Sequence, residues 1–225
     1  MKPNDARTRR AITFLWLNLS AHIILIVLDS VELMLLQRAK TDNSMEVINL
    51  ITTSDLIQLI FAGIYLVILV LTYIFYIQWF RRAYYNLHFQ SDYLSYSEGW
   101  AAGFWFIPVL NLYYPYKIMK EIFSETLSVL GKSEDDFPRA LLRTWWFLYI
   151  LGSVISQIAS RLQFRADDID ELIKGDMISI AGSIVVIFAA IFAVKVIRRY
   201  EPLQEELYAT SQEGDFTRHL APETE

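Results

Sequence analysis

The sequence predicts an all-α integral membrane protein: a four-helix bundle with an interfacial or re-entrant aromatic and proline-containing segment and a cytoplasmic amphipathic helix. Hydrophobic residues make up 54% of the 225-residue chain, and they gather in long runs with few charges. A helix that crosses a hydrocarbon core about 30 Å thick needs about 20 mainly apolar residues, and four runs reach that length. These runs exclude a soluble enzyme domain, a secreted disulfide scaffold and a disordered chain.

The four predicted spans cover residues 11–36, 56–80, 143–163 and 176–197, inside a membrane domain of residues 1–199. An acidic cytoplasmic tail follows over 200–225, with seven acidic residues and one base, Arg218. This tail contributes −6 to the net charge of −5, so the rest of the chain is at +1, and the charge balance implies no nucleic-acid partner. The chain has no cysteine, which excludes disulfides, thiol nucleophiles and cysteine metal sites.

The lysines and arginines predict the direction in which the chain crosses the membrane. Fifteen of the 20 fall at the N-terminus, in the central segment from Arg81 to Arg143, or on the C-terminal side from Lys195 onward. Cytoplasmic loops carry an excess of Lys and Arg, so these three segments are expected on the cytoplasmic side. We therefore expect a multi-pass protein of the inner (plasma) membrane with both termini in the cytoplasm.

A fifth apolar run, residues 99–116, differs from the four spans because it contains Pro108 and Pro115. Proline removes a backbone donor and disfavours helix in the preceding residue, so a straight crossing would leave unsatisfied groups in lipid. We expect an interfacial or re-entrant segment, with a buried connector as the alternative. Apolar residues at helical spacing then predict an amphipathic helix over 115–131, opened by Pro115 and closed by Gly131.

The segment from Gln78 to Ile122 carries a set of aromatic, proline and polar residues at fixed offsets, including the string WFIPxxNLxxPY. With these residues the chain resembles the bacterial membrane family known as domain of unknown function 4328. The resemblance implies a multi-pass inner-membrane protein and supplies no catalytic residues. The residues that carry it are Trp79, Arg82, Tyr84, Asn86, Trp105, Phe106, Pro108, Asn111, Pro115, Tyr116 and Glu121.

Two predicted spans carry polar stripes that are candidates for a polar bundle interior. In the first span Asn18, His22, Asp29 and Glu32 fall within about 80° of one another, at about 100° per residue. Ionisable residues inside a span are costly and mark functional sites by default. The third span contributes a second candidate group, Ser156, Gln157, Ser160 and Arg161.

These stripes have two interpretations. In the functional one, His22, Asp29 and Glu32 form a proton or cation relay. In the structural one, Asn18 and His22 are interhelical hydrogen-bonders and the two acids lie near the outer headgroups. Asp29 and Arg161 each lie 18 residues into their spans, so we also expect Arg161 to pair with Asp29 or Glu32.

No catalytic constellation is apparent, because the three histidines fall in separate segments and no phosphate-binding loop or nucleophile elbow is found. We therefore expect no enzyme, metal site or cofactor. The sequence favours a membrane interaction or assembly protein. A small oligomeric transporter or ion- or proton-conducting protein that uses the first-span stripe is the alternative. The expected partners are the lipid bilayer and either further copies of the chain or another membrane protein.

Overall fold

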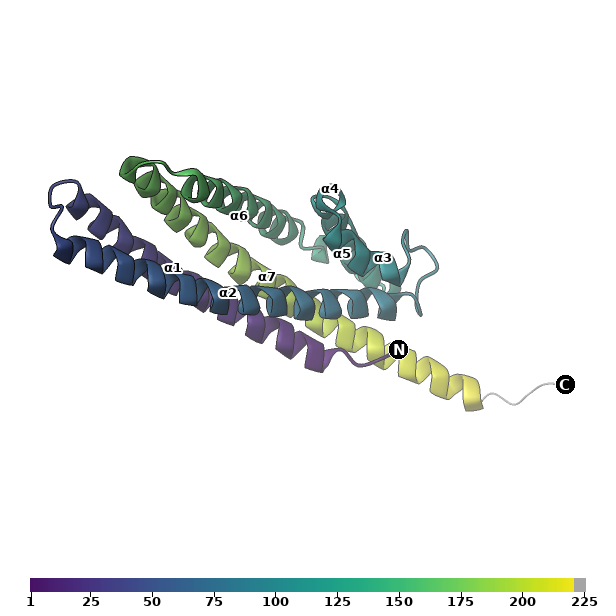
Figure 1. Ribbon diagram of the computed structural model, residues 1–225. Coiled ribbons are helices and arrows are strands. Elements are labelled where there is room, and N and C mark those ends of the chain that lie inside the picture. Colours follow the sequence, from purple (N-terminus) through teal and green to yellow (C-terminus); the bar gives the residue numbers. More distant parts are fainter. Residues whose placement is uncertain (221–225) are drawn as a thin grey trace. The chain divides into compact units, whose positions relative to one another are not determined.

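The computed structural model describes the backbone of residues 1–220 and the side chains of residues 1–212. The end of the predicted acidic tail, 221–225, lies outside the described residues. The described chain is helical and contains no strand. Its elements, seven α-helices and two 3₁₀ turns (Figure 1), are α1 (Asp5–Ala39), α2 (Met45–Leu87), α3 (Glu98–Gly103), η1 (Phe104–Phe106), α4 (Pro108–Asn111), α5 (Tyr114–Val129), η2 (Glu134–Asp136), α6 (Arg139–Arg165) and α7 (Ile169–Leu220).

Four of these helices, α1, α2, α6 and α7, are long and apolar enough to cross a membrane, which confirms the expected number of spanning helices. Each helix extends beyond its predicted span. α2 has 43 residues and is about 65 Å long, roughly twice the thickness of a hydrocarbon core. An apolar run marks only the part of a helix that lies in lipid, and the polar residues on either side continue the same helix.

The chain divides into two compact units. Unit 1 contains Met1–Ile12, Tyr73–Arg143 and the chain from Val194 onward, and unit 2 contains Thr13–Thr72 and Thr144–Ala193. Unit 2 therefore holds the apolar middle of each spanning helix, whereas unit 1 holds helix ends and the segment between α2 and α6.

In unit 2 neighbouring helices run antiparallel. Thr72 of α2 donates from Oγ1 to the carbonyl of Phe14 in α1 at 3.1 Å. Close contact between α6 and α7 depends on glycine, because a Cβ added to Gly152 would lie 2.9 Å from Cγ2 of Val186. Small residues of this kind let membrane helices approach closely.

In unit 1 the buried core is aromatic and aliphatic. α5 turns an apolar face inward, with Ile118, Ile122 and Phe123 all 0% exposed. Phe123 packs edge-on against Tyr200 of α7, with ring centroids 5.3 Å apart, and Thr126 hydrogen-bonds the Tyr200 hydroxyl at 3.2 Å. α5 is thus held against α7 within this unit by both apolar and polar contacts.

The segment 99–116 folds into the short helices α3, η1 and α4 and the start of α5. Pro108 occupies the first turn of α4 and Pro115 the first turn of α5, where a missing backbone donor costs little. Phe106 and Val109 expose 75% and 76% of their surface. A short broken element with exposed apolar side chains replaces the continuous helix that its hydrophobicity alone would suggest.

The predicted amphipathic helix over 115–131 is observed as α5, Tyr114–Val129. Gly131 ends it with φ of +62°, a conformation that residues with a Cβ rarely adopt. Its N–H and that of Lys132 donate to the carbonyls of Ser128 and Leu127, which satisfies the last turn of the helix.

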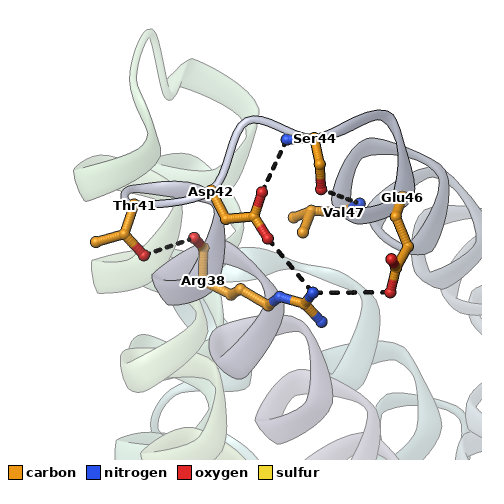
Figure 2. Close-up of polar contacts among 6 residues, drawn as sticks. All are labelled: Arg38, Thr41, Asp42, Ser44, Glu46 and Val47. Carbon is orange, nitrogen blue, oxygen red and sulfur yellow. Dashed lines mark hydrogen bonds and ion pairs between the residues drawn. The ribbon is translucent and has the colours of Figure 1, made fainter.

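The turn between α1 and α2 in unit 2 is a compact polar loop, shown in Figure 2. Arg38 contacts carboxylate oxygens of Asp42 at 3.3 Å and Glu46 at 3.7 Å. Asp42 accepts from the backbone N–H of Ser44 at 3.0 Å, and Ser44 accepts from the N–H of Val47 in the first turn of α2. Lys40 also pairs with Asp170 at the start of α7. These contacts close one end of unit 2.

Candidate functional site

His22 is the centre of a buried hydrogen-bonded chain in unit 2. It lies on α1 with 4% of its surface exposed. Its Nε2 is 3.0 Å from the hydroxyl of Tyr65 on α2, and its Nδ1 is 3.1 Å from Oγ of Ser183 on α7. Asn18, one turn before His22, is 5% exposed and lies near the same Tyr65 hydroxyl. Four polar side chains from three helices therefore meet inside the apolar part of the protein.

Both ring nitrogens of His22 are engaged by hydroxyl groups. A neutral imidazole has one donor and one acceptor nitrogen, and a Ser or Tyr hydroxyl can act as donor or acceptor. Either tautomer of His22 therefore fits the two contacts, with Tyr65 and Ser183 taking the complementary roles. The hydrogen bonds form one continuous chain from Tyr65 through His22 to Ser183.

A second polar group in unit 2 lies further along α1 and α7. Asp29 and Asp176 are 4% and 3% exposed, the burial expected of core residues. Asp176 accepts a hydrogen bond from Nε2 of Gln163 at 3.0 Å, and Asp29 lies close to the Ser179 hydroxyl.

The carboxylates of Asp29, Asp176 and Glu32, which we call the acidic cluster, have too few hydrogen-bond donors. One oxygen of each (Oδ2 of Asp29, Oδ2 of Asp176 and Oε2 of Glu32) is buried and has no hydrogen-bond partner among the described residues. Glu32 lies within electrostatic range of both aspartates and of Asp55 on α2, all of the same sign. The ion pairs of the described residues do not include one from these four acids to a base. A buried carboxylate with neither a full set of donors nor a cation is unfavourable unless a positive charge joins it.

The two polar groups share one stripe on α7. Asp176, Ser179 and Ser183 follow at spacings of three and four residues, which places them on one helix face. Ser179 and Ser183 are about 6 Å apart along the axis at 1.5 Å per residue. His22 and Asp29 lie on the face of α1 that contacts this stripe. Polar side chains therefore follow the contact between α1 and α7 in unit 2. We use the name polar track for Asn18, His22, Asp29, Glu32, Tyr65, Asp176, Ser179 and Ser183.

The residues of α6 that we expected in a polar bundle interior are mostly exposed in the structure. Ser156 faces α7, since a Cβ on Gly182 would lie 3.6 Å from its backbone nitrogen, but Gln157, Ser160 and Arg161 are exposed. The contact face of α6 follows Gly152, Ser156, Ala159 and Gln163, and Arg161 lies about 180° from Gly152 around the helix. Among the described residues Arg161 makes no salt bridge with Asp29 or Glu32, so the expected pair is not formed.

Sequence reasoning missed the partners that α2 and α7 provide. Tyr65 is a polar residue within the predicted span 56–80, and Asp176 lies at the start of the predicted span 176–197. The spacing of Asp176, Ser179 and Ser183 was a readable signal, because three polar residues on one face of an apolar helix suggest contact with another polar face.

The residues that carry the family resemblance gather in unit 1 and hold it together. Tyr84 donates its hydroxyl to Oε2 of Glu121 at 2.6 Å and accepts from the Tyr96 N–H at 3.1 Å. Asn86 exchanges two hydrogen bonds with the backbone of Lys2, at 2.8 and 3.0 Å. These contacts tie α2 to α5 and to the N-terminus.

The aromatic members of this set are buried unevenly. Trp79 is 1% and Trp105 is 8% exposed, and both pack against the ring of Tyr76 at 5.5 Å. Arg82 lies over the Tyr85 ring at 5.3 Å. In contrast Phe106 is exposed, and the remaining members, Pro108, Asn111, Pro115 and Tyr116, lie in the short helices and the first turn of α5. Five members of the set, Trp79, Tyr84, Asn86, Trp105 and Pro115, are therefore buried in unit 1, whereas Phe106 and Pro108 lie at its surface.

Within the described part of the chain, no group of three or more His, Asp or Glu side chains has the arrangement of a metal site. The family described as "Domain of unknown function (DUF4328)" matches residues 39–202. Searches of curated proteins and of solved structures gave no match.

Proposed function

The chain belongs to the DUF4328 family, and we propose that it is a membrane protein that binds and conducts protons through the polar track of unit 2. The observation that carries the proposal is His22, which is buried, lies on an apolar helix and engages both ring nitrogens with hydroxyl groups from two other helices. Ionisable residues in such positions mark ion or proton pathways by default. The proposal assigns no catalytic residue and no cofactor.

The hydrogen bonds at both ring nitrogens supply the means of transfer. In the tautomer with its proton on Nδ1, a proton that arrives at Tyr65 is relayed to Nε2 of His22, while the proton on Nδ1 leaves toward Ser183. The ring returns to its starting state by exchanging its protons or rotating. Histidine suits this role because its free imidazole titrates near neutral pH and each nitrogen both donates and accepts in turn.

The acidic cluster of Asp29, Asp176 and Glu32 could receive or release protons at one end of the same path. Asp29, Asp176 and Glu32 each have a buried oxygen without a donor. A proton on one carboxylate provides a donor for another and relieves the repulsion among them. Since these side chains do not form a metal-type cluster, a proton is the cation that we propose they hold.

Proton flux into liposomes tests this function. Purified protein in vesicles with a trapped pH-sensitive dye should acidify the lumen when a potassium gradient and valinomycin impose an inside-negative potential. His22→Gln should lower the rate at least about tenfold, since it leaves no group that both accepts and releases a proton. The control is His88→Gln, which changes an exposed histidine of unit 1. If vesicles that contain the wild-type protein show no more proton flux than vesicles without protein, the proposal is contradicted.

We also propose the orientation of the chain. The excess of Lys and Arg in the segments that form unit 1 supports a cytoplasmic position for both termini and a bacterial inner-membrane location. Asp29 and Glu32 would then lie toward the outer side and His22 closer to the middle of the membrane.

Assembly through α6 is the second candidate, favoured by the exposure of Gln157, Ser160 and Arg161. An amide and a guanidinium that face lipid are costly, and a second copy of the chain would provide partners for them. Gln157→Leu should then lower the fraction of oligomer seen by mass photometry in detergent. An unchanged mass distribution in Gln157→Leu and in a Gln157→Leu/Arg161→Leu double variant would remove this candidate.

A further inference from the structure

One face of α5 borders a pocket of about 520 Å³ in unit 1. Lys120, Ser124 and Ser128 follow at intervals of four residues along this face, opposite the residues that α5 buries. Arg139 and Arg143, one turn apart at the start of α6, line the same pocket, as does Lys132 from the turn after α5. All these residues belong to unit 1.

The charges of the pocket are strongly unbalanced. Four bases line it against one acid, Glu134, whose side chain is 95% exposed and lies 3.7 Å from Arg139. Lys132 is paired with Glu206 at 2.7 Å. Lys120 and Arg143 take part in no salt bridge among the described residues. The Ser124 hydroxyl donates to the carbonyl of Glu121 at 3.3 Å, so these two cations and the Ser128 hydroxyl remain for a ligand.

The pocket also has the chemistry of a phosphate site. Lys and Arg bind phosphate oxygens by charge, and serine hydroxyls donate to them. The start of α6 adds the positive end of a 27-residue helix dipole beside Arg139. Lys120 is held in place over the Tyr116 ring, 6.0 Å from its centroid.

We propose that this pocket binds a phosphate group, as a monoester or a diester. The same chemistry is offered by two sources. Arg143 stands where the predicted third span begins, at the level of lipid headgroups, so an anionic phospholipid is one source. The other is a soluble phosphorylated compound that reaches the pocket from the water side.

The decisive variant removes the two cations that lack an acidic partner, as Lys120→Gln/Arg143→Gln. Both residues are exposed, so the fold should be kept. The matched control is Arg9→Gln/Arg198→Gln, which removes two exposed cations of unit 1 that do not line the pocket.

Two binding measurements separate the sources. Inorganic phosphate is added to protein in uncharged detergent, against potassium chloride of equal ionic strength, and the melting temperature is followed. Phosphatidylglycerol is added in a parallel experiment, and bound lipid is counted by native mass spectrometry against phosphatidylcholine. A response to phosphate supports the soluble source, a response to phosphatidylglycerol supports the lipid, and a response to both supports one site open to either.

In each of these cases the wild type and the Arg9→Gln/Arg198→Gln control should bind alike. The Lys120→Gln/Arg143→Gln protein should bind at least about tenfold more weakly, because each lost cation contributes to the attraction of an anionic headgroup. Absence of both responses in the wild type would overturn the proposal. Equal binding by the wild type and the pocket variant would overturn it as well.

Discussion

The side-chain amide of Asn4 donates to Oε1 of Gln204 at 3.0 Å, joining two residues that are 200 positions apart in the chain. The same amide contacts the carbonyl of Trp79 in α2 at 3.3 Å. The N-terminus, the end of α2 and the late part of α7 therefore meet in unit 1. An even number of crossings is required for these segments to lie on one side of a membrane.

Topology is the first prediction. Single cysteines placed in this cysteine-free chain at Ser133 and Ser211 should react with an impermeant maleimide only after the cells are permeabilised, because the positive-inside rule predicts that the basic segments are cytoplasmic. Cysteines at Ser44 and Asp168, in the loops after α1 and α6, should react in intact cells. Labelling of Ser133→Cys in intact cells would contradict this threading.

The bond between Tyr84 and Glu121 should contribute to the stability of unit 1. Tyr84→Phe leaves the Glu121 oxygen and the Tyr96 N–H without their buried partner, and the free energy of unfolding should fall by about 1–3 kcal/mol. Thermal unfolding in detergent measures it. In a double-mutant cycle with Glu121→Gln the two effects should be non-additive, and strict additivity would show that the bond contributes nothing.

Close packing of α6 on α7 should depend on Gly152. Gly152→Ala places a methyl group 2.9 Å from Val186, so one helix must shift and the melting temperature should fall. Gly63 is the matched control, since it also lies inside a spanning helix but has no atom within 4 Å of an added Cβ. Gly63→Ala should leave stability unchanged or raise it by up to about 1 kcal/mol. Equal effects of the two substitutions would refute the close-contact explanation.

The α1–α2 loop should show a pH dependence. Hydrogen bonds from Ser44, with a further contribution from Arg38, hold the pKa of Asp42 below its usual value. Because the folded-state pKa is the lower one, this stabilisation is complete above the unfolded-state pKa of about 3.9 and is lost as the pH falls through the folded-state pKa.

Asp42→Asn should therefore melt below the wild type at pH 7, and the difference should shrink toward pH 3. Asp92→Asn, an exposed aspartate of unit 1, is the control and should match the wild type at both pH values. A difference for Asp42→Asn that stays constant between pH 7 and pH 3 would contradict the role of its charge.

The sequence predicted the four spanning helices because hydropathy is a local property. Local spacing also put Asn18, His22, Asp29 and Glu32 on one face of α1, of which the first three are 5%, 4% and 4% exposed and Glu32 is half-buried. The face of α6 could not be predicted in this way. Its orientation depends on the contact between Gly152 and Val186, which turns Gln157 and Arg161 outward, and a contact between distant residues is not visible in the spacing of one helix.

The hydropathy pattern also did not predict where the helices begin and end. α1 begins at Asp5 and α7 continues through Pro202, well outside the apolar runs. Contacts such as Asn4 with Gln204 support these polar extensions, and they join parts of the chain that sequence patterns treat separately.

The central claim, proton transfer through His22, is tested most directly by removing one oxygen atom. Tyr65→Phe keeps the ring that packs edge-on against His22 at 5.2 Å but deletes the hydroxyl that hydrogen-bonds to Nε2 at 3.0 Å. Proton flux of reconstituted Tyr65→Phe protein should fall at least about tenfold, while Tyr93→Phe, which changes an 85% exposed tyrosine, should conduct like the wild type. A proton flux in the Tyr65→Phe protein equal to that of the wild type would contradict the proposed path.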